Sequence, residues 1–160
     1  MSQGIIVRKC ERLDEFHRCV DLQREIWGEA ELEVEPATMF VVAAHTGGEV
    51  LGAFDGDRLV GYTLAVVGLR DRVPYLHSHM TGVHSEYRDR GVGRRLKLFQ
   101  RSEALGRGIR LVQWTFDPLE LRSALQFEPA GRHLPGISAK LVRRHDQPTT
   151  PRPGDRPAAG

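Results

Sequence analysis

Cysteine is scarce in this chain of 160 residues, which contains only Cys10 and Cys19, and aromatic residues make up 7% of it. Two cysteines provide no disulfide framework and are typical of reduced packing residues. No apolar run approaches the roughly 20 residues that a membrane span needs, and the N-terminus lacks the basic-then-apolar pattern of a secretion signal. We therefore expect a soluble protein of the cytoplasm with no membrane partner.

An excess of charge of one sign is also missing, because 23 basic and 21 acidic side chains leave a formal net charge of +2. This balance does not demand a nucleic acid, so we expect no nucleic-acid partner. The basic residues nevertheless gather in one place, at Arg88, Arg90, Arg94, Arg95 and Lys97. A solvated helix face accounts for this cluster as well as a binding surface does.

The length of the chain suffices for one buried core and is too short for two ordinary domains. We expect a single domain over residues 1–145. Residues 146–160 hold Pro148, Pro151, Pro153 and Pro157, four of the nine prolines, and hardly any apolar side chain. Such a stretch buries too little surface to offset the entropy of ordering it, so we expect a disordered, proline-rich tail.

Hydrophobic periodicity predicts a succession of strands and helices. Apolar residues recur near the helical period over residues 13–27, and Gly28 is expected to end that helix. A second helix is expected over residues 91–106, while residues 39–44 fit either a short helix or a strand. Strands are expected at residues 4–10, 50–54, 59–69, 75–83, 109–116 and 137–141, with a tight turn at Asp55-Gly56-Asp57.

The segment from Val83 to Arg94 is the most informative part of the chain. A strand ends there, Gly91 and Gly93 free the backbone of the loop, and a helix begins at once. The arrangement offers backbone N–H groups, the positive end of a helix dipole and flanking arginines to an anion. A dinucleotide-binding loop needs a third glycine where Leu96 stands, and a Walker A loop needs Gly-Lys-Ser/Thr where Arg94 follows. The alternative stays open that Gly91 and Gly93 only allow the chain to turn into a helix and that the loop binds no ligand.

This segment resembles the coenzyme A loop of the GCN5-related N-acetyltransferase (GNAT) superfamily. The family motif Arg/Gln-x-x-Gly-x-Gly/Ala is matched by Arg88, Gly91 and Gly93, and Val83 and Tyr87 match the positions upstream. Phrases such as Leu76-His77-Ser78-His79-Met80 and Trp114-Thr115-Phe116-Asp117-Pro118 resemble a subgroup of predicted acetyltransferases, and the similarity covers about residues 5–119.

The resemblance implies an α+β protein with the GNAT fold. This fold has a mixed, mostly antiparallel sheet with flanking helices, and residues 75–83 and 109–116 form its splayed parallel strand pair. The order of the predicted elements agrees, with one crossover between those two strands. Little chain remains after Leu119, so we expect an incomplete C-terminal part and a homodimer that covers the exposed strand edge.

The same resemblance implies acetyl-CoA or another acyl-CoA, such as succinyl-CoA, as co-substrate, and no metal. The backbone of Thr81, Gly82 and Val83 would pair with the pantetheine arm. The backbone amides of the following loop would hold the pyrophosphate; these belong to Arg88, Asp89, Arg90, Gly91, Val92, Gly93 and Arg94. A glycine at position 82 suits close approach of the arm.

Acyl transfer to the amine of a small molecule requires a neutral amine, which a histidine can provide near neutral pH. Strand alternation places His77 and His79 on one face. We rank His79 first and His77 second as base, against the alternative that both are satisfied polar residues near a sheet edge. Asp117 is a third catalytic candidate, which either orients the acceptor ammonium or caps a turn before Pro118.

The mechanism and its alternatives depend on which residue types are absent near the motif. Neither cysteine lies near it, so direct attack in a ternary complex is expected rather than a covalent acyl-enzyme. Many GNAT enzymes protonate the thiolate with a tyrosine, and no tyrosine follows Tyr87 here. A non-catalytic CoA-binding or regulatory module is therefore the second hypothesis. A nucleic-acid-binding domain that uses residues 91–106 is the third, and the near-neutral charge disfavours it.

Overall fold

The computed structural model describes residues 4–28, 34–116 and 137–141. Their elements follow one another as β1 (Ile6–Lys9), α1 (Leu13–Trp27), α2 (Ala37–His45), β2 (Glu49–Asp55), β3 (Arg58–Arg70), β4 (Val73–Val83), the 3-10 turn η2 (Ser85–Tyr87), α3 (Val92–Gly106), β5 (Val112–Phe116) and β6 (Ile137–Leu141). The stretch 117–136 and the predicted tail at 146–160 lie outside the described residues.

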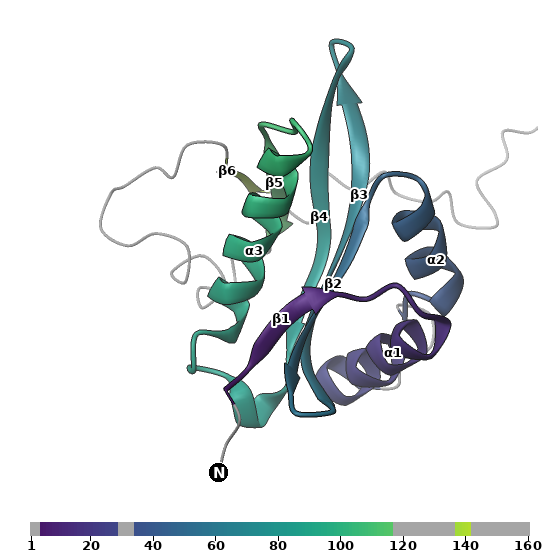
Figure 1. Ribbon diagram of the computed structural model, residues 1–160, viewed down its shortest axis with the longest axis vertical. Coiled ribbons are helices and arrows are strands. Elements are labelled where there is room, and N and C mark those ends of the chain that lie inside the picture. Colours follow the sequence, from purple (N-terminus) through teal and green to yellow (C-terminus); the bar gives the residue numbers. More distant parts are fainter. Residues whose placement is uncertain (1–3, 29–33, 117–136, 142–160) are drawn as a thin grey trace, which may run out of the picture.

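The strands form one sheet in the order β1-β2-β3-β4-β5-β6. The pairs from β1 to β4 are antiparallel, and β4–β5 and β5–β6 are parallel. Helices α1 and α2 cover one face of the sheet and α3 the other (Figure 1). This mixed architecture confirms the predicted α+β class and the parallel pairing of β4 with β5.

Two apolar layers hold the helices to the sheet. On the face of α1 and α2, Phe16, Phe40 and Tyr62 are fully buried, and the Phe40 and Tyr62 ring centroids are 5.8 Å apart. On the other face, Val92 and Leu96 of α3 pack against buried side chains of β2 and β3. Burial of whole aromatic and aliphatic side chains stabilises the fold by about 1.5–3 kcal/mol for each of them.

Several predicted boundaries agree with the structure and others move for clear local reasons. Helix α1 ends at Gly28, whose φ of +88° is unfavourable for other residues. Residues 39–44 belong to a helix. The strand predicted at 109–116 begins only at Val112, because Ile109 N donates to Ala104 O and closes the end of α3. The strand predicted at 75–83 begins two residues earlier, at Val73, because Asp71 and Arg72, both at positive φ, make a tight turn after β3.

A β-bulge divides β4 into two halves. Leu64 pairs with Met80 and the next residue of β3, Ala65, pairs with Ser78, so His79 is an extra residue. Ser78 therefore faces α3, where its hydroxyl meets Lys97, while Met80 packs against the core of α1 and α2. Even-numbered residues of β4 therefore face α3 before the bulge and face α1 and α2 after it.

Candidate functional site

The loop between β4 and α3 presents an open helix N-terminus. Asp89 and Gly91 adopt positive φ values of +62° and +74°, and Gly91 is the N-cap of α3 without a side-chain hydrogen bond. A Cβ on Gly91 would meet nothing within 4 Å, so the backbone angle alone favours glycine there. The first amides of α3 are left without a side-chain cap, which is the geometry that binds anions at helix N-termini.

The arginines around this loop divide into two groups. Arg88, Arg90 and Arg94 are exposed, and the Arg90 guanidinium lies 5.1 Å from the centre of the Tyr87 ring. Arg95 instead donates to Ile5 O at 2.5 Å and ties α3 to the chain just before β1. The exposed three give the loop a positive field, although Arg88 Nε also donates to Val83 O at 3.5 Å, and Arg95 has a structural contact.

The strands β4 and β5 separate beside this loop. They pair at Leu76↔Val112, His77↔Gln113 and Ser78↔Trp114, and the described residues show no pair between them beyond Ser78. Residues 81–83 of β4 pair with β3 on one side only. Their backbone groups on the β5 side thus face the opening of the splayed pair, which we call the fork.

Gly82 is needed for a reason that strand geometry did not reveal. A Cβ at this position would lie 2.8 Å from Ile26 Cδ1 and 3.0 Å from Trp27 Cη2. The missing side chain makes room for the C-terminal turn of α1, on the face opposite α3. Packing by α1 accounts for the glycine without any ligand.

The two candidate histidines lie on the α1–α2 side of β4. His79 Nε2 is 2.8 Å from Glu35 Oε1, just before α2, and its side chain is 41% exposed. His77 is half-buried opposite Val66. Burial lowers the pKa of His77, and the charges of His79 and Lys97 lower it further, so the environment favours the neutral imidazole. The third candidate, Asp117, lies outside the described residues.

Glu35 is a further candidate site residue, which the structure places beside His79. Its backbone is fixed by Gln23 of α1, whose side chain accepts from Glu35 N at 2.9 Å and donates to Glu35 O at 3.1 Å. This clamp holds the carboxylate beside His79, 44 positions away in sequence. A contact at that separation leaves no local pattern.

A buried polar cluster under α3 was not foreseen at all. Lys97 Nζ donates to Ser78 Oγ and lies 3.4 Å from Gln100 Oε1, and the Trp114 ring centre is 5.1 Å away. Glu49 is also buried, and Arg107 reaches its carboxylate at 3.6 Å. The available signal was the three- and four-residue spacing of Lys97, Gln100 and Ala104, which places them on one face of the helix.

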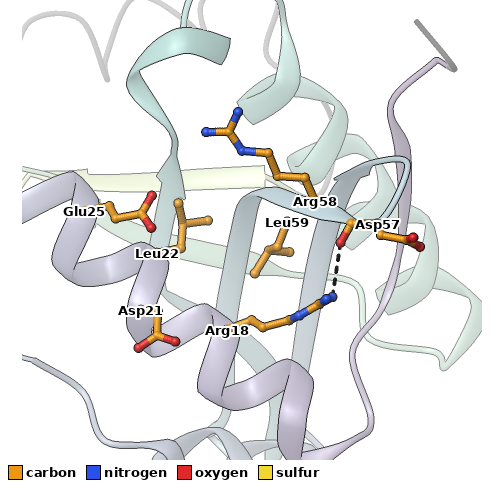
Figure 2. Close-up of a pocket in the computed structure, with 7 residues that line it drawn as sticks. All are labelled: Arg18, Asp21, Leu22, Glu25, Asp57, Arg58 and Leu59. Atoms are coloured by element: carbon orange, nitrogen blue, oxygen red, sulfur yellow. Dashed lines mark hydrogen bonds between the residues drawn. The ribbon is translucent and has the colours of Figure 1, made fainter.

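One shallow pocket of about 300 Å³ lies where α1 meets the β2–β3 turn. Its lining residues are Arg18, Asp21, Leu22, Glu25, Asp57, Arg58 and Leu59 (Figure 2). Arg18 Nη1 donates to Asp57 O at 3.2 Å across it, and Glu25 Oε2 on its rim is 3.4 Å from His84 Nε2. Charges of both signs line the pocket, so it shows no preference for an anion or a cation.

The described part of the chain contains no group of three or more metal-ligating side chains. None of the helices in that part is long and apolar enough to cross a membrane.

Comparison with known proteins identifies the family. The profile of the Acetyltransferase (GNAT) family matches residues 14–126, which is more than half of the chain. The chain therefore belongs to the GNAT acetyltransferase family, whose members are generally N-acetyltransferases. No curated protein sequence matches the chain significantly.

Solved structures share the fold at low sequence identity. The aminoglycoside acetyltransferase meta-AAC0020 from an uncultured soil metagenomic sample, in complex with sisomicin, is 12% identical with a TM-score of 0.68, covering 81% of this chain and 91% of that chain. The aminoglycoside N-acetyltransferase AAC(6')-Iy in complex with CoA is 17% identical with a TM-score of 0.60, covering 82% and 92%. A chain of the NatC complex bound to Gag peptide and CoA is 13% identical with a TM-score of 0.66, covering 78% of this chain and 82% of that chain.

Proposed function

We propose that this chain is an acyl-CoA-dependent N-acyltransferase that transfers an acetyl or related short acyl group, such as succinyl, to the amine of a small molecule or amino acid. The observation that carries the proposal is the meeting of two open features, the unpaired edge of β4 at residues 81–83 and the uncapped N-terminus of α3. An arm with amide groups suits the first, and a pyrophosphate suits the second.

The residues present fit acyl-CoA as co-substrate. Thr81, Gly82 and Val83 offer backbone groups to the pantetheine arm, and the amides of residues 88–94 surround the pyrophosphate position. Asp89 takes part through its backbone, because its carboxylate would repel the phosphates. Arg88, Arg90 and Arg94 supply the positive charge, since all three are exposed at the loop.

A histidine prepares the amine for attack in this proposal. The Glu35 carboxylate orients His79, in the way that a carboxylate commonly fixes the tautomer of a catalytic imidazole. His77, whose pKa is lowered by burial, serves as the second candidate. Either residue removes a proton from the acceptor ammonium, directly or through water, so that the nitrogen lone pair becomes available.

Direct attack in a ternary complex fits the state of the cysteines. Cys10 and Cys19 are buried in the core on the α1 side of the sheet. The neighbouring Cys10 thiol and burial raise the pKa of Cys19, which removes the thiolate that a covalent acyl-enzyme would need.

Calorimetric titration with acetyl-CoA and succinyl-CoA tests the proposal. The Gly91→Glu variant places a side chain at φ +74° and a negative charge at the helix N-terminus, so we expect it to lose saturable binding. Arg88→Ala should weaken binding by about 10- to 150-fold, which corresponds to the loss of one charge-assisted hydrogen bond. The matched control is Arg110→Ala, an exposed arginine beyond the other end of α3, which should bind as the wild type does. A folded wild type that binds neither thioester contradicts the proposal.

A non-catalytic CoA-binding or regulatory module is the second candidate, favoured by the lack of any tyrosine after Tyr87. Both candidates bind CoA, and turnover separates them. Release of free thiol in the presence of a panel of small amines and amino acids supports the enzyme, and binding without release supports the module.

We also propose a homodimer located in the cytoplasm. The exposed Leu69 and Val73 near the β3–β4 turn support self-association, because they leave apolar surface open. Sedimentation of the purified protein measures the oligomeric state.

A further inference from the structure

A lysine buried inside the domain has no obvious structural purpose. Lys97 is 6% exposed, and within the described residues no carboxylate forms an ion pair with it. Its ammonium contacts the Ser78 hydroxyl, the Gln100 amide oxygen and the face of Trp114. Burial of an unpaired charge costs several kcal/mol, and a methionine would fill the same space without that cost.

The position of this lysine is the second observation. Ser78 is the last residue of β4 that pairs with β5, and Trp114 is its partner, so both stand at the closed end of the fork. The loop that opens the fork leads into α3, and Lys97 lies in the second turn of that helix on the side facing the sheet. A donor held by its phosphates at residues 88–94, with its arm along residues 81–83, directs its reacting end toward Ser78.

The surroundings keep the lysine ready to exchange a proton. Burial lowers the pKa of Lys97 to about 7, and the Glu49 carboxyl of β2 opposes only part of that fall. His77 of β4 is the other titratable group that interacts with Lys97, and the lysine charge lowers the pKa of that imidazole. The nearest residues of β5 and α3, Trp114 and Gln100, carry no charge.

We propose that Lys97 delivers, through the hydroxyl of Ser78, the proton that the leaving sulfur of the acyl donor takes up. The inference rests on the proposed acyltransferase function and supplies the acid that the missing tyrosine leaves unassigned. The amine nitrogen forms a bond to the thioester carbon, and the C–S bond breaks with its electron pair going to sulfur. The sulfur takes the Ser78 hydroxyl proton, Ser78 takes a proton from Lys97 Nζ, and solvent reprotonates Lys97. The proton lost by the amine leaves through the histidine base.

Substitution of Lys97 by methionine separates this role from a structural one. We expect Lys97→Met to raise the melting temperature by about 2–4 °C, because a desolvated ammonium is replaced by an apolar chain of similar length. We expect kcat to fall by about 100- to 10,000-fold while KM for acyl-CoA stays unchanged. The wild-type kcat should decline as pH rises through about 7, where Lys97 loses its proton, and the variant should lack this decline.

Further variants and a direct spectroscopic readout complete the test. Ser78→Ala should lower kcat as Lys97→Met does. Ser78→Thr, which keeps a hydroxyl, should have a higher kcat than Ser78→Ala. The matched control is Lys9→Met, since Lys9 is a half-exposed lysine that pairs with Glu103 at the surface, and it should keep the wild-type pH profile. Below pH 7, where Lys97 is protonated, bound CoA should show more thiolate absorbance in the wild type than in Lys97→Met, because the cation favours the anion.

The results that would overturn this role of Lys97 differ from those that would overturn the proposed acyltransferase function. If the wild type binds no CoA, both proposals fail together. If it binds CoA and turns over, but Lys97→Met keeps the wild-type kcat, pH profile and thiolate titration, only the proton-delivery role is overturned. An acyl adduct on Ser78, detected by mass spectrometry of intact protein, would also overturn it, because Ser78 would then be a nucleophile.

Discussion

Single residues of this protein carry roles that only their neighbours reveal. Gly82 lies on the strand that borders the fork, yet its missing side chain faces Ile26 and Trp27 of α1. Lys97 sits on a helix whose other charged residues are exposed or half-buried, yet it points into the sheet. In both cases, contacts with a different element explain the residue type.

A methyl group added at Gly82 tests the packing explanation. Gly82→Ala places a carbon 2.8 Å from Ile26 Cδ1, which forces the packed side chains at the end of α1 to shift. Overpacking of this kind costs about 1–3 kcal/mol, measured as the free energy of unfolding in urea. The control is Gly106→Ala at the end of α3, where a Cβ meets nothing within 4 Å and alanine favours the helix. Equal stability of Gly82→Ala and the wild type would disprove the close packing.

At the scale of elements, the β3–β4 hairpin projects beyond the helices (Figure 1) and turns through two residues, the second of which is poorly suited to its conformation. Asp71 and Arg72 have φ values of +51° and +66°, the angles of a hairpin turn with two left-handed residues. Such angles favour glycine at the second position. The hairpin is thus held by its long strands in spite of its turn.

Replacement of the second turn residue should stabilise the hairpin. We expect Arg72→Gly to raise the free energy of unfolding by about 1 kcal/mol, because the steric cost of a side chain in the left-handed region disappears. Arg110→Gly is the control, since it removes the same side chain at a position without positive φ. Chemical denaturation of both variants measures the difference, and a loss of stability in Arg72→Gly would contradict the explanation.

Sequence reasoning located most elements and fewer contacts. The helix over residues 13–27 followed from periodicity together with Gly28, and the β2–β3 turn from Asp55-Gly56-Asp57, because these signals are local. The bulge at His79 depends on the register of β3, and the Glu35–His79 contact joins residues 44 positions apart. The loop from Arg88 to Arg94 could be located from the sequence, because its motif lies within a few consecutive residues.

At the scale of the whole molecule, one buried carboxyl makes stability depend on pH. Burial raises the pKa of Glu49, and the neighbouring Gln100 amide and Arg107 guanidinium oppose only part of the rise. The folded state therefore binds a proton at Glu49 more readily than the unfolded state does. Glu49 favours folding at low pH, and this contribution is lost as pH rises from 4.5 through the higher pKa of the folded protein.

Removal of this carboxyl should change the pH profile of the melting temperature. We expect Glu49→Gln to melt at a higher temperature than the wild type at pH 7, and the difference to shrink as pH falls below 4.5, where Glu49 becomes protonated in both states. Calorimetric scans at intervals of pH provide the measurement. The exposed Glu11→Gln variant is the control and should follow the wild type throughout. A difference that grows toward low pH would show that the sign is wrong.

The bulge also means that β4 carries one residue more than its pairing with β3 requires. Leu76 and Ser78 face α3, whereas Met80 and Gly82 face the opposite helices, because His79 adds one residue between them. Deletion of His79 would bring Ser78 and Met80 next to each other opposite Ala65 and Leu64, so every remaining side chain of β4 would keep its face. The shortened strand would lose only the imidazole that contacts Glu35, so a relative with a regular β4 would lack a histidine at this place.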